Sequence, residues 1–251
     1  MTGFDGARVV VTGAGGGVGS ALVAALTGAN ARVVACDRPG AALTDPALME
    51  GHHFDQTDAD QAARAAGAIL AGGTPQAVIL NAGATAAETM DQIDDAALAR
   101  ETALNFTGAA AFSRAFLPAM RSAGRGAFVF VSSVNAAMHF GNPAYASAKA
   151  AALAWMRAIA VEEGQRGLRA NAVMPGSIRT PAWDARLAAD PGLMDRVQAL
   201  SPMGRLVTPA EVAQAALFLA SDAASGITGA VLPVDAGIMA GNRPFIEMIG
   251  G

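Results

Sequence analysis

Tyr145 and Lys149 stand four residues apart in the stretch YASAK, and Tyr145 is the only tyrosine of the chain. On a helix this spacing places both side chains on one face. A phenol with an ordinary pKa of about 10 is a poor base at neutral pH, but a neighbouring ammonium group favours the phenolate and lowers that pKa. Such a pair can exchange a proton with an alcohol or carbonyl oxygen as a hydride moves. Taken alone, the same spacing also fits an ordinary surface helix.

A serine is expected to join this pair. Ser133 ends the run FVFVSS, whose apolar residues are typical of a strand buried on both faces. Ligands of open α/β sheets bind at the carboxyl ends of the strands, which is where Ser133 is expected. Its hydroxyl is suited to hydrogen-bond a substrate oxygen.

A glycine-rich turn lies near the N-terminus, in VVVTGAGGGVG. Gly13, Gly17 and Gly19 separate a β-branched run from a stretch with helical periodicity. Glycine lets the backbone approach a ligand closely, and the free N–H groups of a helix N-terminus suit a pyrophosphate. The spacing is G-x-x-x-G-x-G, because Val18 takes the third glycine position of the usual G-x-G-x-x-G. A purely structural glycine turn is the alternative.

A carboxylate follows at the end of the next apolar run. Asp37, in ACDRPG, can accept hydrogen bonds from both ribose hydroxyls of an adenosine and would repel a 2′-phosphate. It therefore favours NAD over NADP. Arg38 is the competing determinant, because a guanidinium can bind that phosphate. Before Pro39, Asp37 also fits a simple turn.

The elements that must position these side chains alternate along the chain. Apolar runs predict strands over 8–12, 31–36, 77–81, 127–132, 168–173 and 230–234, with a short one over 52–54. Helical periodicity covers 18–27, 58–70, 91–121, 143–165 and 209–220, and Asp58 and Thr208 are expected N-caps. This alternation predicts a single doubly wound α/β domain over 1–251, with about seven parallel strands and helices on both faces.

The composition restricts the functions to consider. The chain is 53% hydrophobic and 15% charged, with a net charge of −4 and no basic block, which argues against nucleic-acid binding. No apolar run reaches the ~18 residues that span a bilayer, and the N-terminus does not resemble a signal peptide. Cys36 is the only cysteine, and the three histidines lack ligand spacing, so no metal site is expected. We expect a cytoplasmic protein without a nucleic-acid or membrane partner.

The ordered motifs together resemble the short-chain dehydrogenase/reductase family, and the resemblance covers about residues 3–241. It rests on TGAGGGVG (12–19), FDQTD (54–58), NAG (81–83), NFTG (105–108), VSS (131–133), YASAK (145–149), NAVMPGSIRTP (171–181) and GITGAVLPVDAG (226–237). The resemblance implies a Rossmann domain, NAD(P)-dependent chemistry and a homotetramer.

The resemblance also implies four catalytic roles. Tyr145 corresponds to the general acid and base, and Ser133 to the residue that positions the substrate oxygen. Lys149 would bind the nicotinamide ribose and lower the pKa of the tyrosine. Asn105 would hold a water linked to Lys149 and so extend a proton relay.

A larger set of residues is implied in cofactor binding. Asp55 would contact the adenine, residues 81–83 would border the adenosine ribose, and residues 175–180 would touch the nicotinamide. The full set is Gly13, Gly17, Val18, Gly19, Asp37, Asp55, Gln56, Asn81, Gly83, Tyr145, Lys149, Pro175, Gly176, Ile178 and Thr180.

The substrate region departs from the family pattern. The step from Ser133 to Tyr145 is 12 residues, one fewer than is common in the family, so a shifted register would bring in Ser132 instead. The substrate-facing residues are expected to be Ser133, Asn135, His139, Trp183 and Arg186. A lid is expected over about 177–208, and the apolar tail 241–251 is expected as a loose end or an interface strap.

We therefore expect an NAD-dependent oxidoreductase that interconverts a secondary alcohol and a ketone on a sugar, polyol or other small hydroxylated molecule. One alternative is an NADPH-dependent 3-oxoacyl (acyl-carrier) reductase, which requires Arg38 to prevail over Asp37. The other is a non-catalytic dinucleotide-binding sensor, which would have no need of the complete set Asn105, Ser133, Tyr145 and Lys149.

Overall fold

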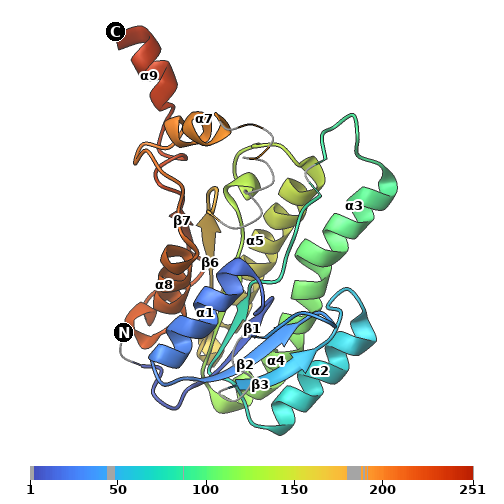
Figure 1. Cartoon of the computed structure of the whole chain (residues 1–251). Coiled ribbons are helices and arrows are strands. Elements are labelled where there is room, and N and C mark those ends of the chain that lie inside the picture. Colours follow the sequence, from blue (N-terminus) through green and yellow to red (C-terminus); the bar gives the residue numbers. More distant parts are fainter. Residues whose placement is uncertain are drawn as a thin grey trace.

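The computed structural model describes residues 3–43, 49–86, 88–179, 188, 190 and 192–250. These residues form a parallel sheet with helices on both faces (Figure 1). Its strands are β1 (Arg8–Thr12), β2 (Arg32–Asp37), β3 (Met49–His53), β4 (Ala77–Leu80), β5 (Gly126–Val131), β6 (Leu168–Pro175) and β7 (Val231–Val234). The order is β3-β2-β1-β4-β5-β6-β7, with each neighbouring pair parallel. The predicted doubly wound Rossmann fold is confirmed.

The order of the strands fixes where a ligand can bind. The chain runs outward from β1 to β3, then returns across the sheet to β4 beside β1. At such a reversal the flanking helices diverge to opposite faces and leave a crevice at the carboxyl ends of the strands. The crevice is thus expected beside Thr12 and Leu80, the last residues of β1 and β4.

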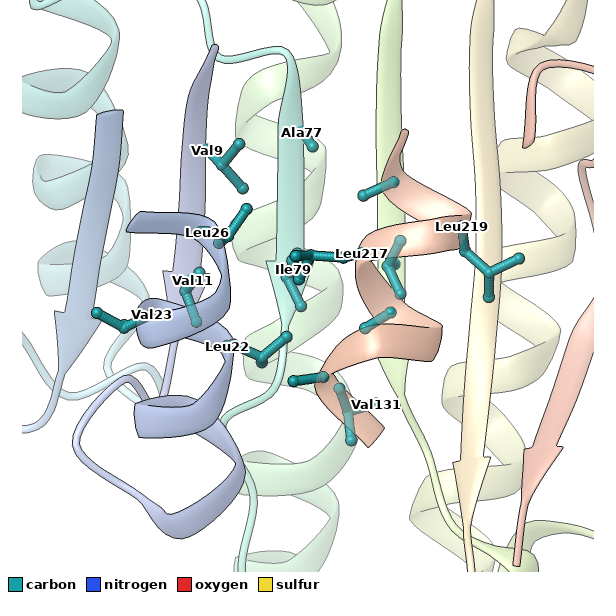
Figure 2. Packing of buried hydrophobic residues seen from close by; sticks show 14 of the residues in the cluster. Val9, Val11, Leu22, Val23, Leu26, Ala77, Ile79, Val131, Leu217 and Leu219 are labelled. Atoms are coloured by element: carbon teal, nitrogen blue, oxygen red, sulfur yellow. The ribbon is translucent and has the colours of Figure 1, made fainter. Parts of the chain in front are cut away.

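The core consists of two layers separated by the sheet. Val9 and Val11 of β1 face one layer and Val10 faces the other, as the alternation of a strand requires. Figure 2 shows the first layer, in which Leu22 of α1 and Leu217 of α8 pack near the sheet. Apolar residues on both faces explain why these strands appear in the sequence as uninterrupted apolar runs.

The helices match most of the predicted ranges. They are α1 (Gly17–Gly28), α2 (Ala59–Ala71), α3 (Asp95–Thr102), α4 (Gly108–Ala123), α5 (Pro143–Glu163), α7 (Leu193–Ala199), α8 (Pro209–Ala220) and α9 (Arg243–Gly250). Asp58 caps α2 by accepting the N–H groups of Asp60 and Gln61. Thr208 caps α8 in a reciprocal box with Glu211. Both predicted caps are confirmed.

The prediction of one helix over 91–121 is wrong. The helix begins at Asp95, because the side chain of Asp94 accepts the N–H of Ala97 and caps it there. It is then interrupted by a π-helical segment, Ala103–Thr107, before α4 begins. Such segments often occur at functional sites, and here Asn105 lies at the centre.

The C-terminal segment forms a helix, α9, which projects away from the sheet (Figure 1). Phe245, Ile246, Met248 and Ile249 are exposed on it. Within the described ranges, no helix combines the length and apolarity needed to cross a membrane.

Candidate active site

A cavity of about 900 Å³ lies at the carboxyl ends of the strands. Fourteen of the predicted site residues line it: Gly13, Gly17, Val18, Asp37, Asp55, Gln56, Asn81, Gly83, Ser133, Tyr145, Lys149, Pro175, Gly176 and Ile178. One continuous space thus joins the glycine turn and the end of β2 to the tyrosine and lysine of α5. Its size is within the usual range for small-molecule sites.

The glycine turn owes its shape to close backbone packing. Gly13 has φ +67°, a conformation that favours glycine. Gly19 does not line the cavity, and a Cβ on it would stand 1.9 Å from the carbonyl oxygen of Gly13. Gly19 is therefore required for the tight packing of α1 against the turn, whereas Gly13 and Gly17 border the cavity.

Asp37 connects the end of β2 to this turn. Its Oδ2 accepts the backbone N–H of Gly15 at 2.8 Å, and its Oδ1 accepts the N–H of Arg38. Both Asp37 and Arg38 line the cavity, so the two competing determinants of the adenosine end are present side by side. Asp55 lies nearby and accepts hydrogen bonds from the N–H and Oγ1 of Thr57.

Asn81 joins the ends of β1 and β4. Its Nδ2 donates to the carbonyl oxygens of Thr12 and Gly13, both at 3.0 Å. The hydroxyl of Thr12 accepts the N–H groups of Asn81 and Ala82. These bonds hold the loop after β4 against the glycine turn and so shape this wall of the cavity.

Tyr145, Lys149 and Ser133 come together at the other end of the cavity. The Lys149 Nζ lies 5.7 Å from the centre of the Tyr145 ring and donates to the carbonyl oxygen of Val131 at 2.9 Å. The side chains of Ser133 and Tyr145 are hydrogen-bonded. Ser132 is buried, and its hydroxyl donates to the carbonyl oxygen of Lys149 at 3.4 Å. The side chain that meets the phenol is therefore that of Ser133 and not that of Ser132.

Burial dominates the electrostatics of Tyr145 and Lys149. Burial raises the pKa of Tyr145 above its ordinary value, and the hydrogen bond with Ser133 opposes this rise. Burial also lowers the pKa of Lys149 to about 8, against the charge of Glu101, which raises it. The lowering of the phenol pKa that is expected from the Lys149 ammonium and a bound nicotinamide is a separate effect, and it stays a prediction.

Asn105 lies behind Lys149, buried and outside the cavity lining. Its Nδ2 donates to Ala84 O at 2.9 Å, to Glu101 O at 3.1 Å and to Glu101 Oε2 at 2.8 Å. Its Oδ1 finds no hydrogen-bond partner among the described residues. A Cβ built on Gly83 would stand 2.7 Å from this oxygen and 3.0 Å from the Lys149 Nζ. Asn105 and Lys149 therefore face the same small space.

Sequence reasoning missed Glu101. It is 5% exposed, and its Oε1 accepts the N–H of Ala86 at 3.0 Å. An acidic residue four positions before Asn105 on a predicted helix was the available signal, since that spacing brings the two side chains together. A second missed signal is that Lys149 is the only lysine of the chain.

The predicted substrate residues are only partly placed. The Asn135 side chain donates to Gly141 O and accepts from Phe140 N, so it stabilises the loop that contains it. Neither Asn135 nor His139 lines the cavity. His139 is exposed. Thr180, Trp183 and Arg186 fall outside the described residues. In the described part of the chain, no three His, Cys, Asp or Glu side chains cluster as a metal site would require.

Known proteins match nearly the whole chain. A family model described as enoyl-(acyl carrier protein) reductase matches residues 13–239. A galactitol 2-dehydrogenase (L-tagatose-forming) of Cereibacter sphaeroides is 38% identical, over 93% of this chain and 95% of its own. A cis-4-hydroxycyclohexanecarboxylate dehydrogenase of Sinomonas cyclohexanicum is 39% identical, over 92% and 96%. The crystal structure of a short-chain dehydrogenase/reductase oxidoreductase from Burkholderia thailandensis has a TM-score of 0.88 and 36% identity, over 100% and 98%.

Proposed function

Because the chain belongs to the short-chain dehydrogenase/reductase family, an oxidoreductase family acting on CH–OH groups, we propose that it interconverts a secondary alcohol and a ketone with NAD. The observation that carries this proposal is that Ser133, Tyr145 and Lys149 share one cavity with Asp37. A continuous space with a carboxylate at one end and an acid–base pair at the other fits a dinucleotide and its substrate.

We propose that Tyr145 Oη takes the hydroxyl proton of the alcohol as the hydride leaves its carbon. The dinucleotide supplies the hydride acceptor and, in its oxidised form, a positive charge beside the phenol. That charge counters the rise that burial imposes on the pKa of Tyr145. Ser133 holds the substrate oxygen through its hydroxyl. Lys149 passes the proton on to a water that accepts it and that donates a hydrogen bond to the buried Oδ1 of Asn105.

Asp37 is the reason for proposing NAD. It ends β2 at the rim of the cavity, and its carboxylate is suited to the ribose hydroxyls and repels a 2′-phosphate. Arg38 lines the same rim and supports the NADP alternative. Asp37 favours NAD more strongly than Arg38 favours NADP, because the Gly15 N–H already holds Oδ2 of Asp37 at the glycine turn.

The substrate class we propose is a sugar, a polyol or another small hydroxylated molecule. The two relatives described above are named for a sugar alcohol and for a hydroxylated ring, and each carries a secondary alcohol. The names of these two relatives do not favour the 3-oxoacyl reductase alternative. Both relatives are named as enzymes, which does not favour a non-catalytic sensor either.

We further propose that a lid spans about 177–208 within one dinucleotide-binding domain and that four copies assemble in the cytoplasm. Exposed apolar side chains support an assembly: Val161 on α5 is 80% exposed, Leu98 lies exposed on α3, and the apolar face of α9 is uncovered. Light scattering on the purified chain tests the number of copies, and a monomer would refute this part.

A substrate panel tests the function. Galactitol, other polyols, aldoses, hydroxy acids and hydroxylated rings are supplied with NAD or NADP while absorbance of the reduced dinucleotide is followed. We expect turnover with NAD and at least one polyol or small hydroxylated molecule. Turnover confined to NADPH with 3-oxoacyl substrates would replace this proposal with its alternative.

A further inference from the structure

Two carboxylates are buried in the described part of the chain, those of Glu101 and Glu163, and only one of them forms ion pairs. Glu163 forms ion pairs with both Arg121 and Arg166. Glu101 is buried to the same extent but forms no such ion pair with a described residue. A buried charge is costly unless another charge or several hydrogen bonds balance it, so the surroundings of Glu101 need an explanation.

The hydrogen bonds of Glu101 fix the direction of the Asn105 amide. The Asn105 Nδ2 faces three oxygen acceptors, two from Glu101 and one from Ala84. If the amide were reversed, its Oδ1 would face these three oxygens and no donor. The carboxylate therefore keeps Oδ1 on the opposite side, beside Gly83 and the Lys149 Nζ. The other carboxylate oxygen accepts the N–H of Ala86, in the connection between β4 and α3.

Glu101 and Asn105 lie on either side of the start of the π-helical segment. Glu101 lies in α3, the last regular helix before the segment, and Asn105 lies inside it. The Glu101 carbonyl oxygen is bonded by the side chain of Asn105 at 3.1 Å. This bond ties the Asn105 side chain to the backbone just before the irregular segment and holds it in place.

The charge of Glu101 acts on both titrating groups of α5. It raises the pKa of Lys149, which burial lowers to about 8, and it also raises the pKa of Tyr145. On α3 the neighbouring Arg100 lines the cavity and pairs with Glu88 at 3.0 Å. Arg100 thus has a carboxylate partner of its own, whereas Lys149 forms no ion pair with a described residue and is influenced by the charge of Glu101.

We propose that Glu101 is a positioning residue of the proton relay, which holds the Asn105 amide with its oxygen toward Lys149 and places a buried negative charge behind that pair. This inference rests on the proposed proton transfer at Tyr145. Glu101 touches neither the cavity nor, by this account, the reacting atoms, and it acts through Asn105 and Lys149.

The single lysine of the chain allows a direct test. In protein labelled with carbon-13 lysine, one side-chain signal reports the titration of Lys149, without dinucleotide or substrate. We expect a midpoint of about 8 in the wild type. In Glu101→Gln the midpoint should fall by about half a pH unit or more, because a charge that raises the pKa is lost. The acid limb of kcat/KM should move to lower pH as well, since the charge raises the pKa of Tyr145 too.

Glu163→Gln is the matched control, because it removes the other buried carboxylate at the far end of α5. It should leave the Lys149 midpoint unchanged. Glu101→Met removes the charge without adding a hydrogen-bond donor beside Ala86. This variant replaces Glu101→Gln in the titration if the glutamine variant does not fold. It should lower the midpoint in the same direction.

An unchanged Lys149 midpoint in the folded Glu101 variant would overturn the inference and leave Glu101 a purely structural residue. That outcome is separate from failure of the proposed function, since a wild-type chain inactive on every alcohol would still give the lysine titration.

Discussion

Lys149 is anchored to the sheet while its ammonium group lies close to the Tyr145 ring. The Nζ donates to the carbonyl oxygen of Val131, the last residue of β5, at 2.9 Å and lies 5.7 Å from the ring centre. This geometry places a cation beside the phenol but buries it, at 5% exposure. Burial of the ammonium group therefore lowers the stability of the folded chain. Substitution of Lys149 measures how much.

Lys149→Met should stabilise the chain while removing turnover. The unfolded pKa of lysine is about 10.4, and burial lowers it to about 8 in the folded chain. Between these pH values the unfolded chain binds more protons, so wild-type stability should rise as pH increases from about 8 to about 10.5. Below pH 8 the methionine variant should be more stable by a value of the order of 2 kcal/mol.

Denaturant unfolding of both proteins at pH 7 and pH 10 provides the measurement for Lys149→Met. The stability difference should shrink at the higher pH, because the wild-type lysine is then neutral in the folded state. A difference that is equal at both pH values would show that burial does not perturb Lys149.

Gly83→Ala should reduce turnover without unfolding the chain. The added Cβ would stand 2.7 Å from Asn105 Oδ1 and 3.0 Å from the Lys149 Nζ, so it would fill the space between the two relay groups. We expect kcat to fall about tenfold or more, by analogy with the loss of a proton-transfer partner. Steady-state kinetics measure this, and wild-type kcat in the variant would exclude a relay through this space.

The control for Gly83→Ala is Gly67→Ala in the middle of α2. Nothing lies within 4 Å of the added Cβ there. Alanine is favoured over glycine inside a helix, so this variant should gain about 0.5–1 kcal/mol in stability and keep full activity.

Asp37→Ala, with Arg38 retained, should shift the preference toward NADP. The substitution removes the carboxylate that repels a 2′-phosphate and leaves the guanidinium that can bind one. The melting temperature measured with NAD or NADP is the readout, and NAD should give the larger shift in the wild type. Equal protection of the wild type by both dinucleotides would contradict the role given to Asp37.

The sequence predicted the sheet closely because its strands are buried on both faces. The apolar run RVVVT coincides with β1, whereas β3 begins at Met49 rather than His52. No sequence pattern predicted the π-helical segment Ala103–Thr107 that interrupts the long helix. It lies next to a close tertiary approach, since a Cβ on Gly108 would stand 2.6 Å from the carbonyl oxygen of Gln56.

The site was predictable where residue type and spacing define the chemistry. The YASAK spacing placed Tyr145 and Lys149 together correctly, but it carried no information on burial, which raises the pKa of Tyr145. Glu101 was not identified from the sequence, because a charged residue in an amphipathic helix is normally assigned to the exposed face. Its carboxylate is held inside by a local contact with Asn105 and by a longer-range one with Ala86.

The most direct test of the account is Tyr145→Phe, which removes the phenolic hydroxyl and keeps the ring beside Lys149. Dinucleotide affinity from calorimetry and kcat with the best alcohol of the panel are measured on the same preparations. We predict that kcat falls about a hundredfold or more while the Kd for NAD stays within about twofold of the wild-type value. A variant that binds NAD and keeps most of the wild-type kcat would contradict proton transfer by Tyr145.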